Sequence, residues 1–428
     1  MSWREQVVSA QMLRAAVVAP ERRFNSVLGA VADVGLFEPD PLMDGSDRLS
    51  GEASVDQQSI NALRTGECAM VSGWVQRRDV EMLRGHVEPL GGAVAELPMP
   101  RGVTPPTAHA DAPISEPLRP LVTTHATVPY RDLDPTLFAA AAYMVMFGMM
   151  FGDVAHGMFV IAVGLVIRAS HNDRLRKAQA AVPFLLGAGV AAVCFGLLYG
   201  EAFGPTGLVP TLWMRPLDDP ETLLVAGLVL GSTLLAITFV LATVNRWRES
   251  GPALALYDAS GVGGGLLFAG AATYLGGVLG SASWLRVLAV ALLAIGFVLT
   301  FTGLLASAGS GASGVMQAAV EMFDTVLRLG SNIVSFTRLA AFGLTHAVIT
   351  EVVWDGTVGL WDRSGAVAIV AAVVLFIVGN AAAIALSGLV GAIQALRLEY
   401  YELFSRLFIS MGRPFVPWHI STRRSEDQ

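Results

Sequence analysis

The feature that most constrains this chain is a succession of long apolar runs that begins near residue 136. An α-helix needs about 20 predominantly apolar residues to cross the hydrocarbon core of a bilayer, where its own hydrogen bonds satisfy the backbone. The runs cover residues 136–152, 154–168, 181–200, 221–244, 256–280, 283–307, 322–354 and 366–410. We therefore predict a mainly α polytopic membrane protein with about eight transmembrane helices, the last two long and tilted.

The composition agrees with a membrane protein. Of the 428 residues, 54% are hydrophobic and 15% are charged, which is too apolar for an ordinary soluble globule. The net charge of -7 gives no clustered basic face, so nucleic-acid binding is not expected. Cys68 and Cys194 make neither a metal-ligand pattern nor a disulfide framework. The N-terminus lacks an apolar signal core, so we expect it to stay uncleaved in the cytoplasm.

The residues before the apolar runs have ordinary charge and predict a small cytoplasmic α/β head over 1–99. QMLRAAVVAP, ECAMVSGWV and AVAELPM are typical of strands, and ERRFNSVLGAVADVG and RRDVEMLRGHVEPLG of helices. Prolines in 100–135 predict a linker. Residues 136–411 would then form the membrane domain, and 412–428 a cytoplasmic tail.

The distribution of charge between the runs predicts the orientation. Basic residues gather in alternate loops and at the C-terminus, at Arg168, Arg174, Arg176, Lys177, Arg246, Arg248, Arg413, Arg423 and Arg424. The intervening loops carry Glu201, Asp218, Asp219, Asp355 and Asp362. By the positive-inside rule both termini are cytoplasmic, and eight crossings satisfy that parity.

Arg338 is the strongest functional signal, because an arginine near mid-membrane costs about 2.5–3.5 kcal/mol on insertion scales and usually faces protein or water. In SNIVSFTRLAAFGLTHAV the spacing places Ser335, Arg338 and Thr345 on one helical face. We interpret this polar stripe as part of an ion path. His346 is more often a hydrogen-bonded core histidine than a proton carrier.

The last apolar run carries a second polar group. Gln394 precedes Arg397 by three residues, so the amide and the guanidinium can meet on one side of the helix. Charged side chains here, including Glu402, can also reach the cytoplasmic surface, which leaves a purely anchoring role open. Asp324 fits a solvated helix end and a channel mouth equally well.

Polar residues also interrupt the earlier runs. Asp153 and His156 lie between glycines in MFGMMFGDVAHGMF, and Glu201 ends LLYGE; for both, a hairpin with polar turn residues is the simpler reading. Neither has metal-site spacing. We find no phosphate loop, nucleophile elbow or metalloprotease motif, so no catalytic site, metal or cofactor is predicted.

Taken together, several motifs resemble subunit a, also called subunit I, of V-type and A-type rotary ATPases. They are FGMMFGDVAHG, LLYGEAFG, SNIVSFTRLAAFGLTHA and IQALRLEYYELFSRLF, with GWV in the head and PYRDLDPT before the first run. The resemblance covers about residues 66 to 411, with the motifs in the family's order and spacing. It is most similar to a bacterial-type member with a short head, in which the long coiled coil and the second lobe are missing.

The resemblance implies a stator that cups a rotating ring of proteolipids, each with a carboxylate, and provides two offset half-channels for H+, or Na+ instead. It implies that ATP is hydrolysed elsewhere in the assembly, and that the partners are this ring, a central-stalk socket subunit, peripheral-stalk subunits and the soluble ATP-hydrolysing sector. The expected location is a bacterial plasma membrane, whose lipids contact the membrane domain.

Carried over to this sequence, Arg338 matches the family's essential arginine, His346 the histidine eight positions later, and Arg397 the second arginine. Asp324 resembles an acidic residue at the cytoplasmic side, and Asp153 lies in the FGD motif near the opposite side. A glutamate of eukaryotic members is Ser387 here, and Gln394 is expected to take part of its role.

Two other functions stay open from the sequence. A stand-alone secondary transporter would use the same buried charges but needs broken helices at the midplane and no ring. A non-pumping membrane scaffold derived from the subunit is the other alternative.

Overall fold

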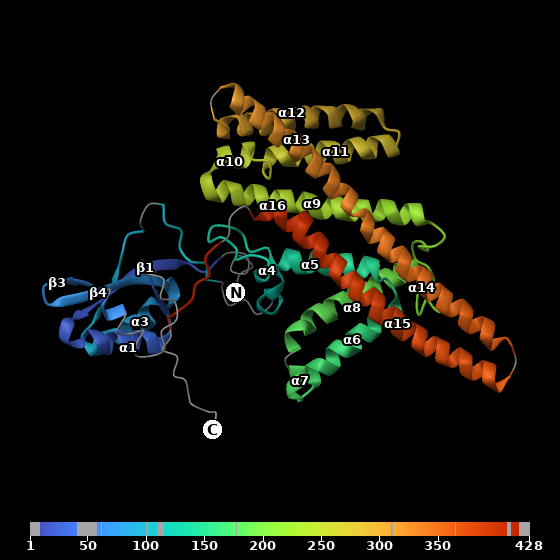
Figure 1. Ribbon diagram of the computed structural model, residues 1–428, viewed down its shortest axis with the longest axis horizontal. Helices are drawn as coiled ribbons and strands as arrows, with labels where there is room; N and C mark the ends of the chain where they lie inside the picture. Colours follow the sequence, from blue (N-terminus) through green and yellow to red (C-terminus); the bar gives the residue numbers. More distant parts are fainter. Residues whose placement is uncertain are drawn as a thin grey trace. The chain divides into compact units, whose positions relative to one another are not determined.

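The computed structural model describes residues 9–40, 58–60, 62–99, 102–108, 115–176, 178–309, 311–363, 365–408 and 412–418. The chain forms two compact units. The first comprises Met1–Ala112, Ala126–Asp134 and Ser410–Gln428, and the second comprises Pro113–His125 and Pro135–Ile409. We call them the head unit and the membrane unit, and Figure 1 shows the elements of each.

The head unit is built on an antiparallel sheet with the order β2-β4-β1-β5. Its strands are β1 (Met12–Pro20), β2 (Phe37–Pro39), β3 (Leu63–Thr65), β4 (Cys68–Gln76) and β5 (Ala93–Glu96), and β3 pairs with β4. Helices α1 (Phe24–Val34) and α3 (Val80–Val87) join the strands. The α/β fold predicted for this region is confirmed. Strands β4 and β5, which α3 connects, are not neighbours in the sheet, because β1 lies between them.

Both helices cover the same face of the sheet. Alternate residues of β1, such as Ala15 and Val17, are fully buried in one cluster with Val27 of α1 and Leu83 of α3. This is the period-two pattern of a strand with one buried face. Gly73, the glycine of GWV, lies where a Cβ would overlap the backbone of β2, so the motif has a local packing role.

The end of the chain packs on the head unit. The backbone N–H of Val416 donates to Glu38 Oε2 at 2.9 Å, and Arg413 Nη1 lies 2.9 Å from Glu38 Oε1. Burial raises the pKa of Glu38, although the Val416 N–H and the Arg413 charge both oppose that rise. The tail segment 412–418 is therefore held by polar contacts rather than free.

The membrane unit is almost entirely helical. Its main helices are α5 (Thr136–Met150), α6 (Val154–Ala169), α8 (Val182–Tyr199), α9 (Pro220–Ser250), α10 (Pro252–Tyr257), α11 (Val262–Leu279), α12 (Ser283–Ser307), α13 (Ala312–Ser335), α14 (Thr337–Trp361) and α15 (Ala366–Leu398). A π-helix (Glu399–Phe404) and α16 (Ser405–Leu407) continue α15. Short helices α4 (Pro120–Thr123) and α7 (Asp173–Arg176) lie in connections.

The protein is a multi-pass membrane protein. Within the described residues, six helical stretches are long and apolar enough to cross a bilayer: Arg174–Tyr199, Pro220–Glu249, Pro252–Val278, Ser283–Ser307, Ala312–Trp361 and Ala366–Leu407. The first two predicted crossings correspond to shorter apolar helices of 15 and 16 residues. The predicted count of eight is therefore not confirmed.

The span predicted over 322–354 lies within the apolar stretch Ala312–Trp361, which the structure divides at one residue. The structure has two helices, α13 and α14, which meet at Phe336. The Phe336 side chain is fully buried and its ring packs on Gly231 of α9. This contact anchors the junction, and as a result Ser335 and Arg338 lie on different helices on either side of it.

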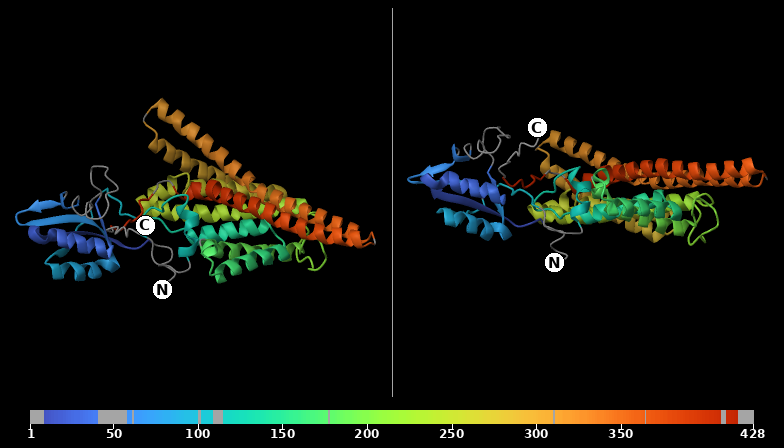
Figure 2. Two further views of the ribbon diagram at one scale, coloured as in Figure 1. Left: turned by 60° about the horizontal axis from the view of Figure 1, so that its bottom comes forward. Right: turned by 90° about the horizontal axis from the view of Figure 1, so that it is seen from below.

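Close helix approaches fix the first part of the membrane unit. At Gly157 of α6 a Cβ would overlap the backbone of α8 at Gly189 and Val193, so these two helices can pack only with a small residue there. Farther along the chain, α14 and α15 lie side by side, as the views in Figures 1 and 2 agree. These contacts bring the α5–α6 turn towards α14.

The head core gives a direct test of this packing. Leu83→Ala should reduce the free energy of unfolding of the head by about 2–5 kcal/mol, because the side chain is fully buried on α3. Its neighbour Met82 is 55% exposed, so Met82→Ala should change stability by no more than about 0.5 kcal/mol. Native-state hydrogen exchange of β4 amides in the full chain measures both, and equal effects would contradict the register of α3.

Candidate functional site

Two groups of polar side chains lie along α14 at Arg338 and His346. Eight residues separate them, which is about 12 Å along an α-helix. The arginine cluster contains Ser335, Arg338, Glu399 and Glu402. The histidine cluster contains Asp153, His156, His346 and Asn380. All of these residues belong to the membrane unit.

Arg338 faces a buried carboxylate. Its Nη1 atom lies 3.7 Å from Glu402 Oε1, and the two side chains are 31% and 7% exposed. The Ser335 hydroxyl is within hydrogen-bonding reach of the same carboxylate. Among the described residues, neither Arg338 Nη1 nor Glu402 Oε2 has a hydrogen-bond partner. The guanidinium is thus attracted to Glu402 but keeps donor capacity for another acceptor.

Glu399 and Glu402 both lie in the π-helix after α15. They are 0% and 5% exposed. π-Helical turns inside α-helices are frequent at functional sites. The alternative that charges here reach the surface is therefore wrong for these two glutamates and for Arg406, which is 7% exposed. Arg397 is exposed, and its anchoring role stays a prediction.

Glu399 is the residue that the sequence analysis left out of the ion path. Both of its carboxylate oxygens are buried, and within the described part of the chain neither has a hydrogen-bond partner. The available signal was the spacing of three residues from Glu402, because residues i and i+3 lie on one face of a helix.

Gln394 and Asp324 lie apart from this pair. Gln394 Oε1 is buried and accepts no hydrogen bond from any described residue, so the predicted contact with the Arg397 guanidinium is not formed. Asp324 is exposed on α13 and pairs with Arg328 at 2.7 Å, one helical turn later. Thr345, predicted on the polar stripe, is exposed and its hydroxyl donates to the Ala341 carbonyl of its own helix.

Asp153 organises the histidine cluster. It caps the N-terminus of α6, where Oδ1 accepts the His156 backbone N–H at 2.9 Å. Its other oxygen, Oδ2, accepts the Gly204 N–H at 2.9 Å. Both bonds are made by a side chain with no exposed surface. The predicted hairpin turn is thus present, and the carboxylate that closes it is fixed in the interior.

His156 and His346 meet although 190 residues separate them. Their ring centroids are 5.4 Å apart, and they are 0% and 1% exposed. The Asn380 amide N–H donates to the Phe376 carbonyl at 2.8 Å. Its Oδ1, 3.0 Å from His156 Nε2, therefore accepts a hydrogen bond from the N–H of that ring nitrogen. His156 Nδ1 is then left with a lone pair and no partner among the described residues. The sequence analysis did not place His156 or Asn380 in the site.

Glu201 lies next to this cluster, in the loop that follows α8. Its backbone carbonyl accepts the Val154 N–H at 2.9 Å, which ties the loop to the start of α6. Burial raises the pKa of the Glu201 carboxyl to about 8, and the nearby charges of Asp153 and Glu351 act in the same direction. This carboxyl is therefore protonated at neutral pH.

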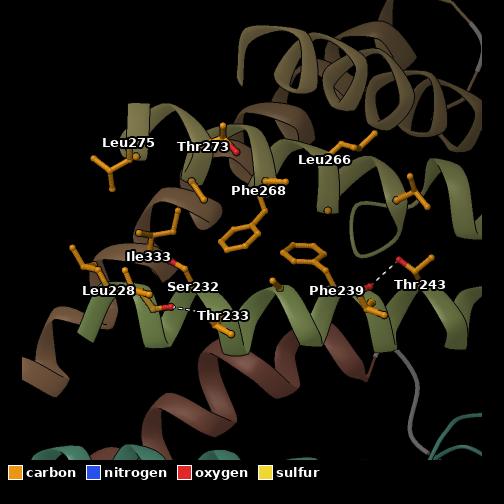
Figure 3. A pocket seen from close by; sticks show the side chains of 18 of the residues that line it. Leu228, Ser232, Thr233, Phe239, Thr243, Leu266, Phe268, Thr273, Leu275 and Ile333 are labelled. Atoms are coloured by element: carbon orange, nitrogen blue, oxygen red, sulfur yellow. Dashed lines mark hydrogen bonds between the residues drawn. The ribbon is translucent and has the colours of Figure 1, made fainter. Parts of the chain in front are cut away.

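A separate cavity of about 790 Å³ lies between α9 and α11, away from both clusters. Figure 3 shows that its lining is mainly apolar and that Phe239 and Phe268 face each other across it. The hydroxyls of Thr233 and Thr243 donate to carbonyls of their own helix. The cavity thus offers few free polar groups, and we do not assign it to an ion path.

The fold and the buried charges define a class: a multi-pass membrane protein with ionisable clusters inside its helical unit. The chain is similar to subunit a, or subunit I, of V-type and A-type ATPases. Residues 57–218 match the V-type ATPase 116 kDa subunit family.

Two archaeal relatives are similar to this chain over most of its length. An A-type ATP synthase subunit I from Aeropyrum pernix is 28% identical over 420 residues, which cover 84% of this chain and 58% of the relative. The subunit I from Methanocaldococcus jannaschii is 24% identical and covers 83% and 55%. A bovine V-type proton ATPase 116 kDa subunit a 2 is 29% identical over 32% of this chain and 18% of its own length. The chain thus spans little more than half the length of the archaeal relatives.

The raised pKa of Glu201 predicts a pH effect. A folded-state pKa near 8, against 4.5 for the free group, means that this carboxyl lowers stability as pH rises from about 4.5 to about 8 and adds no further change above that. Difference infrared spectroscopy should show a protonated carboxyl band that titrates near pH 8 and is absent from Glu201→Gln. Glu221→Gln, on the exposed first turn of α9, is the control. A band that persists in Glu201→Gln would contradict the assignment.

Proposed function

We propose that this chain is the static membrane subunit of a V-type or A-type rotary ATPase. It provides two half-channels that carry H+, or Na+ instead, to and from a rotating proteolipid ring. The observation that carries the proposal is Arg338, a charge inside a membrane-spanning helix of a chain similar to these subunits. Its buried Nη1 has no hydrogen-bond partner among the described residues.

The chemistry begins with the cost of a charge in lipid. A rotor carboxylate has to be neutral while it faces hydrocarbon, because an unpaired ion there is strongly destabilised. Beside Arg338 the ionised form is favoured, so the carboxylate releases its proton to one half-channel. Arginine stays protonated in proteins and therefore relays no proton itself. Arg338 thus separates the two half-channels, which a lysine does poorly because a desolvated lysine loses its charge readily.

The two clusters are assigned to the two half-channels. Glu402, Glu399 and Gln394 carry ions on the cytoplasmic side of Arg338, with Asp324 near the mouth and Arg397 as the second positive charge. The histidine cluster and Glu201 serve the opposite side. The unpartnered oxygens of Glu399 and Gln394 support this assignment, since buried polar atoms without partners are rare unless water or an ion satisfies them.

The assembly follows from the same proposal. The partners are the proteolipid ring, a central-stalk socket subunit, peripheral-stalk subunits that contact the head unit, and a soluble sector that hydrolyses ATP. This chain contributes no catalytic site, and both termini lie in the cytoplasm.

One observation favours a different class. The junction at Phe336 interrupts a membrane helix, as the discontinuous helices of secondary transporters do. A transporter needs no ring, so copurification of the chain from its native membrane separates the two. A small proteolipid with a mid-membrane carboxylate supports the rotary function, and its absence from an active preparation favours the transporter.

Arg338→Lys should abolish ATP-coupled ion transport while the protein stays in the membrane. The Arg338 guanidinium keeps its charge beside the rotor carboxylate throughout the cycle, which a desolvated lysine does poorly. The matched control is Arg328→Lys, because Arg328 is 69% exposed on α13 and pairs only with Asp324 among the residues described. Coupled transport in membrane vesicles is the measurement, and full pumping by Arg338→Lys would remove the mechanism.

Asp324→Asn should slow transport rather than abolish it. An exposed carboxylate at a channel mouth raises the local cation concentration, but it is not required at the separating step. Initial rates of ATP-driven flux give the comparison, with Glu321→Gln on the same helix as the control. An unchanged rate would reduce Asp324 to a solvated helix residue.

A further inference from the structure

The histidine cluster has the composition of a metal site. The candidate ligand atoms of Asp153, His156 and His346 all lie within 4.8 Å of one another, and all three residues are buried. The sequence analysis found no metal-site spacing, since the third ligand comes from a helix 190 residues farther along the chain. Folding creates the group by packing the α5–α6 turn against α14.

The imidazoles of this cluster are the second, independent observation. His346 is 1% exposed, and neither of its ring nitrogens has a hydrogen-bond partner among the described residues. His156 Nδ1 is equally buried and without such a partner. Buried polar atoms normally have hydrogen-bond partners. A bound ion or a water would supply the partners that these two imidazoles lack.

We propose that Asp153, His156 and His346 bind one divalent transition-metal ion of the zinc class. Two imidazoles and a carboxylate suit Zn²⁺, whereas Mg²⁺ and Ca²⁺ prefer oxygen ligands alone. A tetrahedral Zn²⁺ with bonds of about 2.0–2.1 Å needs ligand atoms about 3.4 Å apart. The ligand atoms lie within 4.8 Å of one another, so binding requires small side-chain rotations, and a water would be the fourth ligand.

The surroundings of the ligands also fit a metal. A metal-binding histidine usually donates its other ring N–H to a carbonyl or carboxylate, which fixes the tautomer. His156 Nε2 lies 3.0 Å from Asn380 Oδ1, so Nδ1 is the nitrogen left to bind the ion. The Gly204 N–H on Asp153 Oδ2 holds that carboxylate in place in the same way.

The binding test is independent of the test of the rotary function, because metal binding needs neither the ring nor ATP. Its test uses the full-length purified protein in detergent, stripped with a chelator and then incubated with Zn²⁺ alone. Equilibrium dialysis with elemental analysis should find one tightly held zinc per chain. His346→Gln, His156→Gln and Asp153→Asn should each lower the affinity at least tenfold.

His86→Gln is the matched control, because His86 is an exposed histidine on α3 in the head unit. It should leave the tight zinc unchanged. Cobalt(II), used as a spectroscopic substitute, should give the intense visible bands of a four-coordinate site, and His86→Gln should keep them.

A variant that retains a ligand guards against misfolding as the cause of lost binding. His346→Cys should still bind cobalt and should add a sulfur-to-metal charge-transfer band that the native protein lacks. The proposal is overturned if the native chain holds no saturable zinc. It is equally overturned if a variant that combines His346→Gln, His156→Gln and Asp153→Asn binds as much zinc as the native chain. Cobalt binding by His346→Cys without the new band would also overturn it.

Discussion

A guanidinium held inside the bilayer is the constraint on which the rest of the membrane unit depends. Such a charge is strongly destabilised in lipid alone, and the surrounding helices stabilise it with an opposite charge. Glu402 lies opposite Arg338, and Ser335 lies beside Glu402. Two irregular elements make this arrangement possible. After the junction at Phe336 a new helix starts one residue before Arg338, and Glu402 lies buried in the π-helix. The ion pair is loose, since Nη1 is 3.7 Å from the Glu402 carboxylate. The guanidinium can therefore still interact with a second carboxylate, such as that of a rotor subunit.

Much of this architecture was predictable from local patterns. Period-two alternation gave the strands of the head, and long apolar runs gave the membrane helices, because both signals come from burial of side chains close in sequence. Arg338 was recognisable for the same reason, as a charge flanked by apolar residues on both sides. The 15- and 16-residue helices α5 and α6 show the limit of this reading, since adjacent apolar runs do not reveal whether each crosses the bilayer.

The remaining features depend on contacts between distant parts of the chain. No glycine or proline marks the junction at Phe336; it is anchored by packing of that ring on Gly231 of another helix. Glu399 was left out of the predicted ion path, because its complete burial depends on packing against other helices rather than on its local sequence. His156 and Asn380 were missed since their partners are supplied by α14 and α15, far along the sequence. The two clusters on α14 are therefore a product of tertiary packing.

The central claim is that Arg338 faces the carboxylates of a rotating ring. Ala341 lies one turn along α14 on the same side as Arg338 and is exposed, whereas its neighbour Ala340 is 4% exposed. In native membranes, with Cys68 and Cys194 replaced by serine, Ala341→Cys should form a disulfide with a cysteine placed beside the proteolipid carboxylate, and Ala340→Cys should not. Equal cross-linking at both positions, or none at Ala341→Cys in an active complex, would contradict the account.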